Sequence, residues 1–243
     1  MPGMSDMHEL KKRVYEANLR LSNSGLVIET FGNVSGVDRR AGWVAIKPSG
    51  VAYDTLTADH IVVVSLETGD VLDGSHRPSV DTPTHLALYR GLADIGGVAH
   101  THSLYATAWA QARHDIPVLG TTHADYCHGP FPCARPLTAE EIQSAYEANI
   151  GKTLVERMEG LDPKAVPGAL AANHGPFTWG SSADAAVHHA IILEHLARLA
   201  SETLRVDSYP RLVSQELLDK HYLRKHGKGT YYGQREQPGR AKG

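Results

Sequence analysis

The sequence has few cysteines and no long apolar run, and these absences exclude several classes of protein. Its 243 residues include two cysteines, Cys127 and Cys133, which cannot form a disulfide framework and whose spacing matches no zinc knuckle. No stretch of about 18 uncharged apolar residues occurs, which excludes a transmembrane helix. The first residues enter helical periodicity without the apolar run of a signal peptide. We expect a cytoplasmic protein with reduced thiols and no membrane contact.

An excess of charge of one sign is also lacking. Lys and Arg number 24 against 27 Asp and Glu, which gives a net charge of −3 and does not favour binding to nucleic acid or to an anionic membrane. With 42% hydrophobic residues, the chain is too apolar to be a disordered protein. Histidine, by contrast, is abundant at 15 residues. Because imidazole is the commonest metal ligand and titrates near neutrality, this surplus directs attention to a metal or catalytic site.

The first part of the chain mixes one helix with short strands. Apolar residues at helical spacing predict a helix over 5–21, with Gly25 as its stop signal. Strand-like runs follow at 26–30, 43–47 and 60–65. A glycine-containing link directly after the third run indicates a hairpin.

The rest of the chain is richer in helices. Asp81, Thr82 and Pro83 form a helix-start signal, with Asp81 as a candidate cap. The patterns predict further helices over 103–113, 138–158, 181–204 and 213–226, and strands over 97–102 and 116–119. We predict one α/β domain over 1–243, in which helical layers cover a central, mostly antiparallel sheet.

The sharpest sign of chemistry is the pair His100 and His102, separated by one threonine. Residues two apart in a strand point to the same face, so these two imidazoles can converge on one metal ion. His174, which follows the apolar run 169–172 at a Gly-Pro corner, is a candidate third ligand, and Asp81 offers a carboxylate. This set suits Zn²⁺, Mn²⁺ or Co²⁺. Taken singly, His174 also fits an ordinary loop histidine, and Asp81 fits a helix cap.

Two glycine-containing segments, GNVSG at 32–36 and KPSG at 47–50, have the composition of an anion pocket. Glycine lets the backbone approach an anion, amides and hydroxyls donate hydrogen bonds to it, and the lysine adds charge. Neither segment matches a nucleotide-binding fingerprint. Each of them, taken alone, also fits a hairpin turn.

Candidate proton-transfer groups are Asp125, His221 and either Tyr231 or Tyr232. The alternative interpretation is that they are surface residues on a helix and on the tail. Residues 220–243 carry seven Lys and Arg against one acid, which is compatible with a nucleic-acid-binding arm. A solvated terminal helix with a frayed end is the preferred interpretation of this segment.

Taken together, eight segments resemble the L-ribulose-5-phosphate 4-epimerases of the class II aldolase family. They occur in the family's order from about residue 8 to 234: GNVSGVDR, IKPSGV, TADHIVVVS, DTPTHLALY, GGVAHTHS, GTTHADY, HGPFTWG and HYLRKHG…YYGQ. The combination is highly specific, although each motif alone is not.

The resemblance implies a mostly antiparallel sheet between helical layers and a cyclic homotetramer with active sites between subunits. It implies one divalent metal ion per subunit, with zinc favoured over manganese or cobalt, held by His100, His102 and His174 with Asp81 nearby or as a fourth ligand. It also implies a substrate and phosphate pocket made of Gly32, Asn33, Lys47, Ser49, Gly50, Ser79 and Val80.

By the same resemblance, Asp125 and Tyr232 look like the acid/base pair, with Tyr232 supplied by the adjacent subunit and His221 as an accessory group beside it. Residues from about 227 to 243 would be a tail that reaches this neighbour. The implied reaction converts L-ribulose 5-phosphate into D-xylulose 5-phosphate by retro-aldol cleavage and aldol addition, in L-arabinose catabolism. One departure is that Val80 stands where the family has a second serine, which removes a hydroxyl donor to the phosphate.

The nearest alternative is a true aldolase of the same family, which carries Glu where this chain has Asp81. Asp81, the THADY segment and the YYGQ end favour the epimerase. A non-catalytic interaction domain would lack metal ligands, whereas all three histidines are present. A nucleic-acid binder acting through the basic tail is the least favoured alternative.

Overall fold

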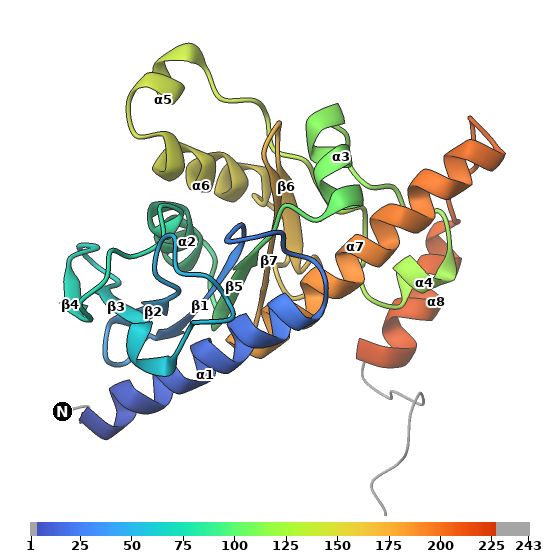
Figure 1. The fold of residues 1–243 in the computed structure, drawn as a ribbon. Coiled ribbons are helices and arrows are strands. Elements are labelled where there is room, and N and C mark those ends of the chain that lie inside the picture. Colours follow the sequence, from blue (N-terminus) through green and yellow to red (C-terminus); the bar gives the residue numbers. More distant parts are fainter. Residues whose placement is uncertain (1–3, 227–243) are drawn as a thin grey trace, which may run out of the picture.

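One seven-stranded sheet runs through the part of the chain that the computed structural model describes, residues 4–226 (Figure 1). The strand order is β4-β3-β2-β1-β5-β7-β6, and all neighbouring strands are antiparallel. The strands are β1 (Asn33–Asp38), β2 (Trp43–Ile46), β3 (Val62–Ser65), β4 (Val71–Asp73), β5 (Gly97–His100), β6 (Gly168–Ala171) and β7 (Gly175–Gly180). The sheet confirms the predicted fold class.

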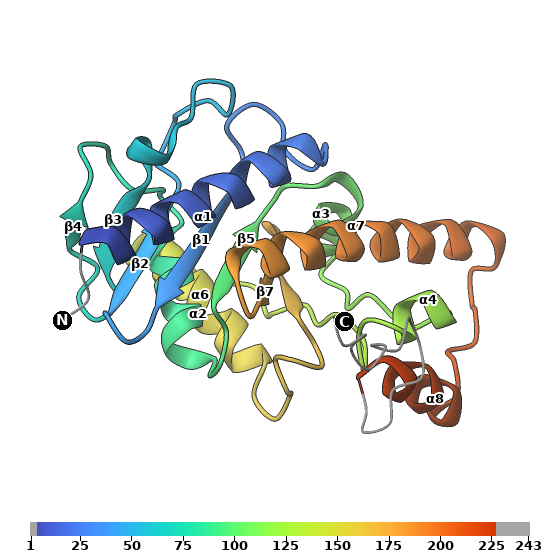
Figure 2. The ribbon, with the colours of Figure 1, turned by 90° about the horizontal axis from the view of Figure 1, so that it is seen from below.

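Helices cover both faces of this sheet. They are α1 (Met4–Asn23), α2 (Thr82–Gly91), α3 (Leu104–Ala112), α4 (Thr121–Ala124), α5 (Ala139–Gln143), α6 (Tyr146–Arg157), α7 (Ala183–Val206) and α8 (Gln215–His226), with a short 3₁₀ turn at Ala58–His60. Helices α1 and α7 lie across one face, while α2 and α6 lie behind the other (Figure 2). No helix within residues 4–226 has the length and apolar character needed to cross a membrane.

The side chains of β3 show why two layers form. Val62 and Val64 pack into the hydrophobic cluster that includes Leu86 of α2. Val63, between them, packs into the opposite cluster with Leu10 of α1. Because successive side chains of a strand point to opposite faces, a run of buried valines supplies both cores.

The strand predicted over 26–30 is absent, and this prediction was wrong. The segment is a turn in which the backbone N–H of Phe31 donates to the carbonyl of Ile28, and Glu29 has a φ of 52° in the left-handed region. Strand β1 lies immediately after it and pairs with both β2 and β5. The β-branched residues of the segment favour a strand. The residues of β1 that follow gain pairing partners on both sides, and this pairing outweighs the local strand propensity.

The prediction of a strand over 116–119 was also wrong. Ile116 forms a single bridge in which it exchanges both backbone hydrogen bonds with Phe131. Pro117 follows directly and has no N–H to continue a ladder. Pairing therefore stops after one residue.

The helix predicted over 138–158 is divided into α5 and α6. Its capping box is present, because Thr138 and Glu141 each bond the other's backbone N–H. The backbone leaves the helical region at Ser144, with φ −98° and ψ −102°. Asn149 spans the break by donating to the carbonyl of Glu141 and to the hydroxyl of Ser144.

Candidate metal centre and substrate cleft

Three imidazoles meet at one end of β5 and β7. Strand β5 ends at His100 rather than at the predicted residue 102, and His102 follows it by two residues. His174 lies in the turn between β6 and β7. The Nε2 atom of His100 is 3.1 Å from that of His102 and 3.1 Å from that of His174. The predicted convergence of the three histidines is confirmed as geometry, although only His100 belongs to a strand.

The protonation of His100 suits a metal ligand. Its Nδ1 lies 3.0 Å from the carbonyl oxygen of Pro176, so Nδ1 carries the proton and donates, which leaves the Nε2 lone pair free. Burial lowers the pKa of His100 to about 3, and burial also lowers the pKa values of His102 and His174. Neutral imidazoles at pH 7 are the form that binds a metal ion.

Asp81 lies beside these imidazoles and does not cap its helix. It occupies the residue before α2, but its side chain makes no capping hydrogen bond. Its carboxylate instead accepts a hydrogen bond of 2.6 Å from Nδ2 of Asn33. Burial acts to raise the pKa of Asp81, but the electrostatic influence of His100 and His85 and the Asn33 hydrogen bond hold it below its ordinary value. The helix-cap interpretation is therefore wrong, and a carboxylate remains available to a cation.

These residues, referred to below as the metal group, are suited to binding a divalent metal ion. The ligand atoms of His100, His102 and His174 all lie within 4.8 Å of one another, and this is the one such group of three found among residues 4–226. Imidazole nitrogens with a nearby carboxylate are a borderline donor set, which Zn²⁺, Mn²⁺ or Co²⁺ accepts. Glycine at 175 is required by the packing here, since a Cβ would meet the carbonyl oxygen of Thr101 at 2.8 Å.

A cleft of about 240 Å³ opens over this group. Its lining brings together all the residues predicted for the metal and for the substrate, and adds Thr30, Phe31 and Pro48, which were not among the predicted site residues. The lining residues are Thr30, Phe31, Gly32, Asn33, Lys47, Pro48, Ser49, Gly50, Ser79, Val80, Asp81, His100, His102 and His174.

The two glycine-containing segments do form walls of this cleft. The first is not a hairpin turn, because Asn33 begins strand β1. The Nδ2 of Asn33 also donates to Ser79 Oγ at 3.1 Å, and its Oδ1 is buried without a hydrogen-bond partner. Lys47 is buried, donates to the carbonyl of Val51 at 2.6 Å and lies over the ring of Tyr53. Burial lowers the pKa of Lys47 to about 8, so the cleft keeps a positive charge near neutrality.

Two of the residues that line the cleft carry exposed apolar side chains. Val80 is 59% exposed and Phe31 is 55% exposed. The ring of Phe31 stacks on that of His102 with centroids 5.7 Å apart. Sequence reasoning missed Phe31, whose position directly before the GNVSG segment was the available signal.

Asp125 and His221 lie elsewhere in the chain. Asp125 follows α4, and its carboxylate accepts from Arg224 Nη2 at 2.9 Å and lies 3.0 Å from Nδ1 of His221, both on α8. Lys225 is 3.5 Å away. Burial acts to raise the pKa of Asp125, but hydrogen bonds from Arg224 and His221 hold it below its ordinary value. The sequence signal for this cluster was the spacing 221, 224 and 225, which places three side chains on one face of α8.

This second cluster does not line the cleft. Neither Asp125 nor His221 is among the residues that border it. Helices α4 and α8 lie to one side of β1 and β5, below the outer half of α7 (Figures 1 and 2). Tyr231 and Tyr232 are outside the described residues. Within one chain, the three histidines with Asp81 and the Asp125 cluster are therefore two separate groups.

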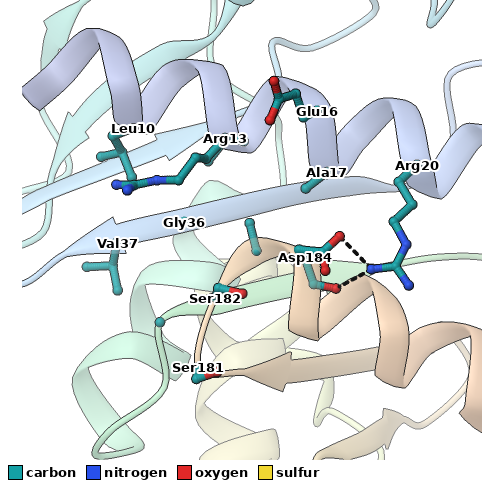
Figure 3. Close-up of a pocket in the computed structure, with 13 residues that line it drawn as sticks. Leu10, Arg13, Glu16, Ala17, Arg20, Gly36, Val37, Ser181, Ser182 and Asp184 are labelled. Carbon is teal, nitrogen blue, oxygen red and sulfur yellow. Dashed lines mark hydrogen bonds and ion pairs between the residues drawn. The ribbon is translucent and has the colours of Figure 1, made fainter. Parts of the chain in front are cut away.

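A cavity larger than this cleft lies away from both groups. It measures about 480 Å³ and lies between α1 and the start of α7, where Arg20 and Asp184 form an ion pair (Figure 3). None of the residues predicted for catalysis, metal or substrate lines it. The larger of these two cavities is therefore not the one that the predicted site residues line.

Comparisons with a family model, with known sequences and with solved structures each find related proteins. The family model of the class II aldolase and adducin N-terminal domain matches residues 12–201. L-ribulose-5-phosphate 4-epimerase UlaF of Salmonella paratyphi B is 49% identical over 229 residues, which are 94% of this chain and 100% of that protein. A solved L-fuculose 1-phosphate aldolase superposes with a TM-score of 0.77 at 24% identity over 91% of this chain and 96% of its own. The L-fuculose-1-phosphate aldolase from Thermus thermophilus gives 0.64 at 21% identity, over 83% and 98%.

Proposed function

The chain belongs to the class II aldolase and adducin N-terminal domain family, and within that family we propose that it is an L-ribulose-5-phosphate 4-epimerase. The observation that carries this proposal is the 49% identity to such an epimerase across the whole length of that relative. The cleft supports it independently, because imidazoles, a carboxylate, glycines and a lysine surround one space. The product would be D-xylulose 5-phosphate, as L-arabinose catabolism requires, and the enzyme would act on this phosphorylated sugar in the cytoplasm.

The chemistry explains why an epimerase shares a fold with aldolases. The hydrogen on C4 of the substrate is not acidic, so simple deprotonation cannot invert that carbon. Removal of the C4 hydroxyl proton instead allows the C3–C4 bond to break, which gives the enediolate of dihydroxyacetone and glycolaldehyde phosphate. Rotation of the aldehyde presents its other face, and re-formation of the bond followed by protonation of the new alkoxide gives the epimer.

The residues of the cleft take the binding roles in this scheme. His100, His102, His174 and Asp81 would hold one divalent ion, with zinc favoured, and that ion supplies Lewis-acid stabilisation of negative charge on the substrate oxygens. Gly32, Asn33, Lys47, Ser49, Gly50, Ser79 and the backbone of Val80 would hold the substrate and its phosphate. The unpartnered Oδ1 of Asn33 is available to a substrate hydroxyl.

Asp125 and Tyr232 would act on opposite faces of the aldehyde, with Tyr232 supplied by an adjacent subunit and His221 beside it. Because Asp125 does not line the cleft of its own chain, we assign it to a neighbouring subunit as well. The separation of Asp125 from the cleft within one chain supports a homotetramer with shared sites. The exposed side chains of Phe31 and Ile28 near the cleft also favour cover by a neighbour.

The deciding experiment incubates the metal-loaded protein with L-ribulose 5-phosphate and follows the mixture by ³¹P and ¹³C NMR. D-xylulose 5-phosphate without free glycolaldehyde phosphate is the expected result. Cleavage fragments alone would identify an aldolase instead. Absence of turnover with metal bound would show that the pocket around Val80 accepts a different sugar phosphate.

A further inference from the structure

A chain of three buried polar side chains lies behind the metal group. The hydroxyl of Ser35 on β1 is 2.7 Å from Nδ1 of His85 and 2.8 Å from the phenol oxygen of Tyr89. His85 and Tyr89 are one turn apart on α2, and all three residues are at most 1% exposed. None of them lines the cleft, so the proposed reaction gives them no role.

The direction of the hydrogen bonds in this chain fixes the tautomer of His85. The backbone of Val98 donates to the phenol oxygen of Tyr89, so the Tyr89 O–H is free to donate to Ser35, whose own O–H donates to Nδ1 of His85. If His85 donated to Ser35 and Ser35 donated to Tyr89, the Tyr89 O–H would have no acceptor. Burial lowers the pKa of His85 to about 4, so the ring is neutral and carries its proton on Nε2.

That Nε2–H has no partner. The atom is buried and makes no hydrogen bond, which is costly for a donor removed from water. One metal-site residue, Asp81, and the ring of Phe177 lie near the His85 ring. Asp81, in the residue directly before α2, interacts with His85 electrostatically. The His85 ring meets that of Phe177 edge to face at 6.0 Å, and Phe177 stacks on His100 at 4.1 Å.

We propose that His85 is a positioning residue for the metal ligand Asp81. Its Nε2–H donates to the Asp81 carboxylate when that carboxylate engages the divalent ion, while Ser35 and Tyr89 hold the required tautomer. In the present structure the carboxylate accepts from Asn33. A second donor fixes the orientation of a ligating carboxylate and thereby strengthens metal binding. The inference rests on the proposed metal site but is independent of which sugar phosphate is the substrate.

Two substitutions of similar size separate this role from simple packing. His85→Gln keeps an N–H donor near the Nε2 position, whereas His85→Asn keeps a polar group near Nδ1 and loses the Nε2 donor. Affinity for Zn²⁺ is measured by competition with a chelator, on apo-protein and without substrate. We expect about 10–100-fold weaker binding for His85→Asn and recovery of most of that loss in His85→Gln. Wild-type affinity in His85→Asn, or equal losses in both variants, would overturn the proposal.

A measurement on the unaltered protein covers the case in which a variant does not fold. Long-range ¹H–¹⁵N NMR on histidine-labelled apo-protein reports the tautomer of each neutral ring. Protonated Nε2 and bare Nδ1 at His85 are expected, and the opposite tautomer would overturn the proposal. Because affinity is measured without substrate, an active enzyme whose His85→Asn variant binds Zn²⁺ normally contradicts this inference alone. A metal-binding wild type without epimerase activity contradicts the proposed function alone.

Discussion

The Nε2 atoms of His100 and His174 lie 3.1 Å apart, although the residues are 74 positions apart in the chain. The pairing of β5 with β7 brings them together, since His100 is opposite Phe177 in the ladder and His174 lies in the turn just before β7. The metal group is therefore a product of sheet register. A slip of one residue would turn the His100 side chain to the other face of the sheet.

Replacing His100 or His102 by alanine should remove the metal ion and nearly all turnover. Each substitution deletes one of three converging imidazole nitrogens, and the remaining ligands bind a divalent ion much more weakly. Metal content after gel filtration, together with turnover of L-ribulose 5-phosphate, checks this. His195→Ala, at an exposed position on α7, is the matched control and should retain both. Full metal content in His100→Ala would refute the ligand assignment.

The metal group could be predicted from sequence because its signals are local. His100 and His102 are two residues apart, and His174 stands at a Gly-Pro corner after an apolar run. His85 had no such signal, because the role proposed for it depends on its hydrogen bond with Ser35 and on its electrostatic interaction with Asp81, which follow from the packing of α2 against β1. A histidine on a helix otherwise fits many roles.

The two wrong strand predictions also concern contacts that form only in the folded chain. Residues 26–30 have strong strand propensity, but the ladder positions between β2 and β5 belong to β1. The pairing at Ile116 ends because proline follows. The spacing of apolar residues along the sequence was sufficient to predict a sheet covered by helical layers. Which of two neighbouring segments pairs in the sheet is decided by tertiary contacts, which the sequence pattern does not show.

Tyr232→Phe should retain the metal ion and lose activity, since phenylalanine keeps the ring and lacks the proton-donating hydroxyl. Mixing this variant with His100→Ala after mild dissociation should restore part of the activity, because a mixed assembly contains sites with one intact half from each subunit. Each variant mixed with itself is the control. Activity that does not rise in the mixture would exclude sites shared between subunits.

Arg224→Gln should move the acid limb of the kcat/KM profile to higher pH. Hydrogen bonds from Arg224 and His221 outweigh burial and hold the pKa of Asp125 below its ordinary value. Removing the guanidinium therefore raises that pKa, and the carboxylate becomes protonated at a higher pH than in wild type. Profiles measured at saturating metal check this, with Arg205→Gln on α7 as the control, because that guanidinium pairs with Glu202. An unmoved limb would mean that Asp125 ionisation does not govern the reaction.

The apo-protein should lose stability as the pH falls from about 6.5 towards 4. Burial lowers the pKa of His123 to about 4 from an ordinary value of 6.5, so within this window the unfolded chain binds a proton that the folded chain does not. Each such histidine costs as much as about 1.4 kcal/mol per pH unit. Urea unfolding at fixed protein concentration should give a shallower pH slope for His123→Gln than for wild type. A wild-type slope in His123→Gln would contradict the prediction.

Val80→Ser should lower KM for L-ribulose 5-phosphate by about two- to tenfold, the range expected for one added hydrogen bond, with little change in kcat. The side chain lines the cleft and is 59% exposed, so a hydroxyl can be introduced there without disturbing the core. The neighbouring Ser79 hydroxyl accepts a hydrogen bond from Asn33 and keeps its own O–H for the phosphate, so a serine at position 80 would add a second hydroxyl donor on this wall. Val80→Ala is the control, because it removes the same methyl groups without adding a donor. If serine and alanine give the same KM, the backbone N–H at residue 80 already supplies the contact, and the departure from two serines carries no penalty for phosphate binding.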